Sequence, residues 1–205
     1  MRLNEARKDL YRRLAKEQGY KSRAAFKLIE ANERYGFIRQ GARVADFGSA
    51  PGGWMQVASE LVGPSGLVVG VDVSPVHLKE RNVIAIKMDV NDPLVPSKVA
   101  EALGGEADVV LSDLAPTVSG VWELDQTRQV DLTLRILGLC PLLLKERGGA
   151  FFKLFEGERS QEVRNEFRRT FKSVRVLKPA ASRTASSELY YYCEGLIAKP
   201  LVRED

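Results

Sequence analysis

Short apolar runs alternate along the chain with segments in which apolar residues recur every three or four positions. The runs are typical of buried strands and lie near residues 42–48, 66–73, 84–90, 107–115 and around 153. The amphipathic segments predict helices near 53–62, 123–147 and 159–170. Strands that alternate with helices predict an α/β domain, a parallel sheet covered by helices on both faces.

The two ends of the chain depart from this alternation. Before the first strand we expect a basic helix and then an amphipathic helix that begins at Ser22 as its N-cap. After residue 170, the runs KSVRVLKP and ELYYYCEGLIAK follow each other with no helix between them. They predict an antiparallel, hairpin-like pair of strands at one edge of the sheet.

Length and composition limit the class of protein. A chain of 205 residues is most simply one domain, 1–205, with residues 1–40 as a basic helical region packed on it. No apolar run approaches the ~20 residues of a membrane span, and the first residues lack a signal-peptide core, so we expect a cytoplasmic protein. Cys140 and Cys193 are expected to be buried thiols, and a single histidine, His77, argues against a multi-histidine metal centre.

Charge is distributed unevenly around a net value of +4. Residues 1–27 hold nine Lys/Arg against three Asp/Glu, and residues 159–185 hold eight against two, whereas residues 28–158 are acidic. If the fold brings the basic segments to one face, they would form a footprint for a phosphate backbone; otherwise they are solvated helix faces. The candidate cations are Lys8, Arg12, Arg13, Lys16, Lys21 and Arg23, and Arg164, Arg168, Arg169, Lys172, Arg175 and Arg183.

Ligands of parallel sheets bind at the carboxyl ends of the strands. The first strand ends in DFGSAPGGW, residues 46–54, where Gly48, Gly52 and Gly53 permit a tight turn just before a helix. This turn matches neither GxxxxGK[ST] nor GxGxxG, so it is neither a phosphate loop nor a dinucleotide fingerprint.

The next two strands end in carboxylates. Asp72 follows Gly52 by twenty residues, where an acid commonly binds ribose hydroxyls, and Asp89 and Val90 could meet an adenine ring. Acids would repel a pyrophosphate but tolerate a sulfonium cation, so S-adenosylmethionine fits better than NAD.

Two further residues stand at the ends of the fourth and fifth strands. Asp113 follows Ser112, although an isolated strand-end aspartate is often only a turn former. Lys153 stands among Phe151, Phe152, Leu154 and Phe155, where it could reach water at an edge, but burial of an unpaired ammonium is costly.

Five motifs in order, DFGSAPGGW, VDVSP, SDLAPTVSG, FKLFEGE and SSELYYYC, resemble the FtsJ-like ribosomal RNA 2′-O-ribose methyltransferases. The resemblance extends from about Tyr20 to Lys199. It implies a Rossmann-like S-adenosylmethionine-dependent methyltransferase fold, with a mostly parallel seven-stranded sheet whose last strand is antiparallel. It also implies a catalytic tetrad of Lys27, Asp113, Lys153 and Glu188, and no metal.

The resemblance carries the cofactor site onto the same strand ends. The expected cofactor contacts are Gly48, Ser49, Pro51, Gly52, Gly53, Trp54, Asp72, Asp89, Val90 and Asp113. The family would have alanine where this chain has Ser49, a small-for-small change.

The reaction expected from the resemblance is methyl transfer to a ribose 2′-hydroxyl, with a uridine of 23S-type large-subunit ribosomal RNA as the substrate and Lys153 as proton acceptor. The partner would be ribosomal RNA within the large subunit, and the enzyme would be a monomer. Family members that act on transfer RNA share the tetrad, so a transfer RNA methyltransferase stays open, as does a non-catalytic RNA-binding module.

Physical chemistry supports such a role for Lys153. A free lysine, with a pKa of ~10.4, is mostly protonated at neutral pH, and burial beside a second cation, Lys27, would disfavour the ammonium form. Asp113 and Glu188 act in the opposite direction and would orient the lysines. Base stacking is expected on Tyr20, Phe37 or Tyr190–Tyr192.

Overall fold

The computed structural model describes residues 3–182 and 186–198, and over these residues one sheet of seven strands forms in the order β3-β2-β1-β4-β5-β7-β6. The first five strands run parallel, and β7 runs antiparallel to both β5 and β6. The strands are β1 (Arg43–Phe47), β2 (Leu67–Asp72), β3 (Val83–Lys87), β4 (Ala107–Ser112), β5 (Leu144–Phe155), β6 (Phe171–Leu177) and β7 (Glu188–Leu196). The predicted sheet and its antiparallel last strand are confirmed.

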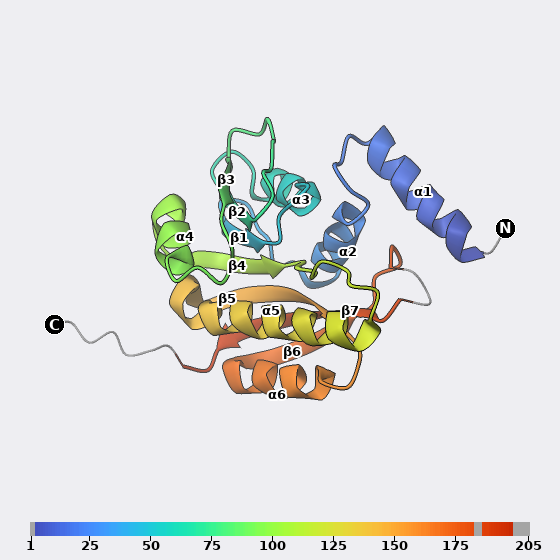
Figure 1. Cartoon of the computed structure of the whole chain (residues 1–205). Coiled ribbons are helices and arrows are strands. Elements are labelled where there is room, and N and C mark those ends of the chain that lie inside the picture. The colour runs from blue at the N-terminus through green and yellow to red at the C-terminus, as the bar shows by residue number, and fades with distance from the viewer. Residues whose placement is uncertain (1–2, 183–185, 199–205) are drawn as a thin grey trace.

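Helices cover both faces of the sheet, as predicted (Figure 1). One face carries α2 and α3, and the other carries α4, α5 and α6. The helices are α1 (Leu3–Glu17), α2 (Ala25–Tyr35), α3 (Gly53–Val62), α4 (Val95–Leu103), α5 (Trp122–Leu143) and α6 (Ser160–Thr170).

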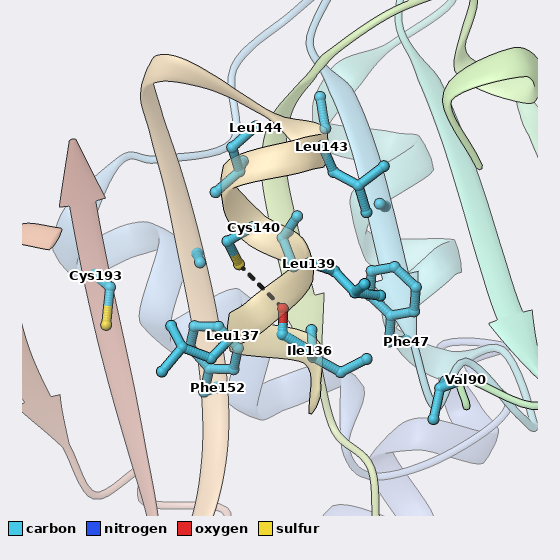
Figure 2. Packing of buried hydrophobic residues seen from close by; sticks show 14 of the residues in the cluster. Phe47, Val90, Ile136, Leu137, Leu139, Cys140, Leu143, Leu144, Phe152 and Cys193 are labelled. Carbon is cyan, nitrogen blue, oxygen red and sulfur yellow. Dashed lines mark hydrogen bonds between the residues drawn. The ribbon is translucent and has the colours of Figure 1, made fainter. Parts of the chain in front are cut away.

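Two hydrophobic clusters, one on each face, form the core. Side chains of α5 fill the space over the central strands around Phe47 and Phe152 (Figure 2). Alternation along β7 sends Tyr191 to this cluster, whereas Tyr190 and Tyr192 join the cluster under α2 and α3. Cys140 and Cys193 are buried free thiols, as predicted.

Two details of the helices differ from the sequence prediction. Helix α4 was not predicted, although Val95, Val99 and Leu103 are buried at the spacing of one helical face. Ser22 is not the N-cap of α2, because that helix begins at Ala25 after Ala24, which makes no side-chain capping bond. Ser22 lies instead so close to Gly53 that a Cβ at residue 53 would collide with its hydroxyl. This contact fixes the chain before α2 against the start of α3.

Candidate active site

Lys153 and Asp113 meet at the carboxyl ends of two adjacent strands. The β4–β5 register ends at Ser112 and Phe152, so the next residues of both strands project from the same end of the sheet. Lys153 Nζ donates to the backbone carbonyl of Asp113 at 2.7 Å and lies 3.1 Å from its Oδ1. Only 5% of Lys153 is exposed. Both contacts of this buried ammonium come from one residue.

Lys27 and Glu188 form a second pair beside the first. Lys27 lies in the first turn of α2, and Glu188 opens β7, far along the chain. Lys27 Nζ donates to Glu188 Oε2 at 2.9 Å, and 4% of Lys27 is exposed. A buried ion pair of this kind holds its partners in one geometry, because removal of either charge leaves the other unpaired.

Tyr190 joins the two pairs. Its hydroxyl accepts from Lys27 Nζ at 2.8 Å and donates to Asp113 Oδ1 at 3.2 Å. Burial raises the pKa of this hydroxyl well above its usual range, and the charges of Asp113 and Glu188 raise it further, so Tyr190 stays a neutral phenol. The structure therefore brings all four predicted tetrad residues into one continuous chain of contacts.

Two neighbouring cavities border this cluster and share Gly48, Ala50 and Asp113. The first, which we call the catalytic cavity, is about 230 Å³ and lies between the start of α2 and the turn at 48–54. The second, the acidic cavity, is about 360 Å³ and opens along the ends of β2, β3 and β4. Lys153 and Glu188 line neither cavity. Each contacts a residue that does, since Lys153 pairs with Asp113 and Glu188 pairs with Lys27.

The predicted cofactor residues are divided between these cavities. The catalytic cavity is lined by Gly48, Ser49, Pro51, Gly53, Trp54 and Asp113, and the acidic cavity by Gly48, Asp72, Asp89, Val90 and Asp113. Gly52 lines neither, but its φ of 110° explains why glycine is needed at that point of the turn.

Gly48 marks the closest approach within the turn. It has a φ of 79°, and a Cβ there would meet the backbone of Leu114 at 2.9 Å. Asp72 holds the same turn, because its Oδ2 accepts from the N–H of Ala50 at 3.0 Å. Trp54 Nε1 donates to the carbonyl of Ala24 at 2.8 Å and so ties α3 to the segment that carries Lys27. The turn therefore orders both the cavity floor and the catalytic helix.

Asp46 is a functional candidate that the sequence reasoning missed. It is fully buried in β1, and neither carboxylate oxygen has a hydrogen-bond partner among the described residues. Burial raises the pKa of its carboxyl well above the usual range, and the charges of Asp113 and Asp72 raise it further. The sequence could have pointed to Asp46, because this residue begins the DFGSAPGGW motif. Three acids, Asp46, Asp72 and Asp113, therefore gather at this end of the sheet, and Lys153 pairs with Asp113.

The prediction of base-stacking residues is wrong for four of the five aromatic side chains. Phe37 and the three tyrosines of β7 are at most 9% exposed and belong to the core, so they cannot receive a base from solvent. Tyr20 is half-buried, and its hydroxyl donates to Glu60.

The two basic segments share one face of the sheet only in part, since Arg175 of β6 lies over the ring of Tyr35 in α2. Helix α6 packs on the face opposite α2, and its Arg164 and Arg169 pair with Glu156 and Glu166. Arg12, Lys16, Lys21 and Arg23 instead line a groove of about 510 Å³ that also includes Ser22. Ser22 and Arg23 line the catalytic cavity as well, so this basic groove leads into it. The Lys8 side chain and Arg183 lie outside the described residues.

Comparison with known proteins agrees with this geometry. Residues 20–196 match the family model described as FtsJ-like methyltransferase. The chain is 43% identical over 187 residues to ribosomal RNA large subunit methyltransferase E of Methanothermobacter thermautotrophicus, covering 91% of this chain and 89% of that protein. It is 44% identical over 196 residues to the protein of the same name from Cenarchaeum symbiosum, covering 95% and 98%.

Solved structures give the same fold. A Plasmodium falciparum protein described as a ribosomal RNA methyltransferase is 26% identical, with a TM-score of 0.77 over 88% of this chain and 100% of that chain. Fibrillarin from Aeropyrum pernix, solved with natively bound S-adenosyl-L-methionine, is 18% identical, with a TM-score of 0.57 over 82% and 75%. The model match covers most of the chain and the relatives align over nearly their full lengths, so this chain belongs to the FtsJ-like methyltransferase family.

Proposed function

We propose that this protein transfers a methyl group from S-adenosylmethionine to the 2′-hydroxyl of a uridine in large-subunit ribosomal RNA. The observation that carries the proposal is the continuous cluster of Lys153, Asp113, Tyr190, Lys27 and Glu188 beside two cavities. Relatives above 40% identity carry the name ribosomal RNA large subunit methyltransferase E, which supports the choice of substrate.

The acidic cavity fits the nucleoside part of the cofactor. Asp72 and Asp89 face it with Val90, which suits ribose hydroxyls and an adenine edge, and within the described part of the chain no lysine or arginine lines it to hold a pyrophosphate. Gly48 lies so close to the backbone of Leu114 that no side chain fits at residue 48. The buried carboxyl of Asp46, whose oxygens have no hydrogen-bond partner among the described residues, lies just before the same turn. When bound, S-adenosylmethionine supplies an electrophilic methyl group on a positively charged sulfur.

The four charged residues act on the acceptor hydroxyl. Lys153 Nζ, fixed by two contacts to Asp113, steers the 2′-hydroxyl, and once it has lost a proton to solvent its neutral amine takes the hydroxyl proton as the oxygen attacks. Lys27, fixed by Glu188 and Tyr190, supplies a second positive charge on the other side of Asp113. Alignment of reacting groups can supply ~7–11 kcal/mol, whereas general base catalysis contributes ~10²–10⁴-fold. Positioning therefore dominates in this site.

RNA enters along the basic groove between α1 and α2. Four cations line it, and it shares Ser22 and Arg23 with the catalytic cavity. Such cations contact phosphates and fix the position of a strand without reading its sequence. The whole chain works as one catalytic domain, with the N-terminal helices as the RNA-binding part.

The proposal is tested by incubation of the protein with labelled S-adenosylmethionine and unmodified RNAs made by in vitro transcription. We expect label in large-subunit ribosomal RNA, mapped to the 2′-oxygen of a uridine. Parallel reactions with transfer RNA and assembled large subunits distinguish the acceptors. Labelling of transfer RNA alone would replace the substrate, and no labelling of any RNA would refute the reaction.

A further inference from the structure

An exposed apolar patch surrounds the start of α5. We call it the Trp122 patch, and it comprises Val118, Val121, Trp122 and Leu124, which are 81%, 54%, 47% and 40% exposed. Isolated apolar side chains on a surface are common, but a group that includes a tryptophan indicates an interaction site. None of these residues lines the catalytic cavity or the acidic cavity.

The patch adjoins the catalytic lysine through one ring. The centroid of the Trp122 ring lies 5.8 Å from that of Phe155, with 32° between the ring planes. Lys153 Nζ lies 5.6 Å from the centroid of the same Phe155 ring. The Trp122 indole therefore lies one ring away from Lys153, the residue proposed to act on the acceptor ribose, although Trp122 is not part of the tetrad.

The loop before α5 holds the patch in place. Ser119 N–H donates to both carboxylate oxygens of Asp125, at 2.9 and 3.1 Å, and Asp125 is buried. The N–H of Val121 donates to Ser119 Oγ at 3.1 Å. These bonds close the loop onto the first turn of α5, so the indole is presented to solvent by a fixed backbone.

We propose that Trp122 stacks on a nucleobase adjacent to the nucleotide whose ribose is methylated. The inference rests on the proposed function, and it assigns the substrate a second point of contact besides phosphate. Single-stranded RNA is bound by stacking of splayed bases on aromatic rings. Of the aromatic residues that the sequence placed near the tetrad, Phe37 and Tyr190–Tyr192 are buried and Tyr20 lines the basic groove, whereas Trp122 has an exposed face.

The basic groove argues for a nucleobase as the occupant. The groove reaches the cluster from the Lys27 side, through Ser22 and Arg23, and the Trp122 patch lies on the Lys153 side. A strand that follows the cations into the catalytic cavity and places its ribose at Lys153 continues toward the indole. The uncharged Trp122 indole can stack on a base at that point without an ion pair.

Fluorescence tests the stacking directly. The chain has two tryptophans, of which Trp54 is buried at 3% exposure and Trp122 is not. A single-stranded oligouridylate of about twelve nucleotides should quench the indole emission of the wild-type protein, because stacking on a base quenches tryptophan. The variant Trp122→Phe retains Trp54 and should lose that quenching while it still binds the RNA.

Kinetics test the consequence for the reaction. With in vitro transcribed large-subunit ribosomal RNA, Trp122→Ala should raise the RNA KM roughly 5- to 150-fold, the range for loss of one base–aromatic stack. The dissociation constant of S-adenosylmethionine should not change, and Trp122→Phe should retain most of the activity. Leu142→Ala, at an equally exposed position at the other end of α5, is the matched control and should leave the RNA KM unchanged.

The outcomes separate this inference from the function on which it rests. An unchanged KM for Trp122→Ala with no quenching by oligouridylate would overturn it. A defect with assembled subunits but not with naked RNA would also overturn it, in favour of a ribosomal protein as occupant. If the wild-type protein methylates no RNA, the proposed function fails, and the difference in quenching between the wild type and Trp122→Phe still decides whether Trp122 stacks on bases, because both proteins retain Trp54 in the catalytic cavity.

Discussion

The Lys153 side chain is buried, and its Nζ contacts both the carbonyl and the carboxylate of Asp113. Replacement by methionine keeps an unbranched side chain but removes the ammonium. We expect the single-turnover rate to fall at least ~10²-fold, since both the proton acceptor and the steering contact are lost. The affinity for S-adenosylmethionine should change little, because Lys153 lines neither cavity.

Rapid-quench assays and calorimetric titration of the cofactor measure the two quantities separately. Lys145→Met is the control, because Lys145 is an exposed lysine that pairs with Asp108 at 2.6 Å outside both cavities. Loss of cofactor binding with otherwise normal turnover would show that the assigned role of Lys153 is wrong.

The buried carboxyl of Asp46 leads to a prediction of how the stability of the fold depends on pH. Its folded pKa is raised above the ordinary 3.8, so from about pH 4 upward the unfolded chain has lost a proton that the folded protein retains. This carboxyl therefore contributes a stability that is full below pH 3.8 and is lost as pH rises through the folded pKa. An asparagine side chain cannot titrate, so Asp46→Asn should melt at a higher temperature than the wild type, and the difference should grow from pH 4 to pH 7.

Thermal unfolding of both proteins at a series of pH values checks this, with a shift of roughly 2–4 °C in Tm for each kcal/mol in a chain of this size. Asp131→Asn, at an exposed aspartate of α5, is the control. A wild type that gains stability relative to Asp46→Asn as pH rises would refute the assigned direction.

At the scale of elements, Gln129 of α5 fixes the end of β5. Its Nε2 donates to the carbonyl of Lys153 at 2.8 Å, and its Oε1 accepts from the N–H of Phe155 at 3.1 Å. The β4–β5 register ends at Ser112 and Phe152, so this buried amide binds the strand where β4 no longer can. Gln129 is thus a positioning residue for the catalytic lysine.

Gln129→Leu should destabilise the fold by roughly 1–3 kcal/mol, because it removes the partner of the Phe155 N–H and leaves the Lys153 carbonyl with only the 3.4 Å bond from Thr133 Oγ1. It should also lower the turnover more than the affinity for S-adenosylmethionine, which a purely structural role would not do. Denaturant unfolding, turnover and cofactor titration report these effects, with Gln161→Leu on the exposed face of α6 as the control. Equal losses of turnover and cofactor affinity would count against a positioning role.

The elements show what periodicity can and cannot predict. The strands were found because runs such as VVGVD and FFKLF are buried on both faces and rich in β-branched or aromatic residues. Helix α4 was missed because its buried stripe consists of only three residues in a short segment beside Pro96. Ser22 fits the composition of an N-cap, but its contact with Gly53 depends on packing between distant segments.

At the scale of the whole molecule, Asp113, Lys153 and Glu188 could be located because each lies in a quoted motif, and Lys27 lies in the amphipathic helix expected before the first strand. The joining role of Tyr190 could not be predicted, since the three adjacent tyrosines look alike until the register of β7 decides which faces the tetrad. Charge counts found two basic segments but could not show that α6 packs on the face opposite α2. The predicted RNA-binding footprint is therefore reduced to the basic groove, which is lined by Arg12, Lys16, Lys21 and Arg23.

The reduced footprint predicts a specific salt dependence. Each cation that contacts a phosphate of single-stranded RNA releases counterions, so the logarithm of affinity falls with that of salt concentration by ~0.7 per contact. Lys16→Ala in the basic groove should therefore weaken RNA binding and make this slope shallower by about that amount. Arg168→Ala is the matched control, because α6 lies on the other face, and its slope should equal that of the wild type. Dissociation constants measured between 50 and 300 mM KCl give both slopes, and a larger change for Arg168→Ala would move the RNA path to α6.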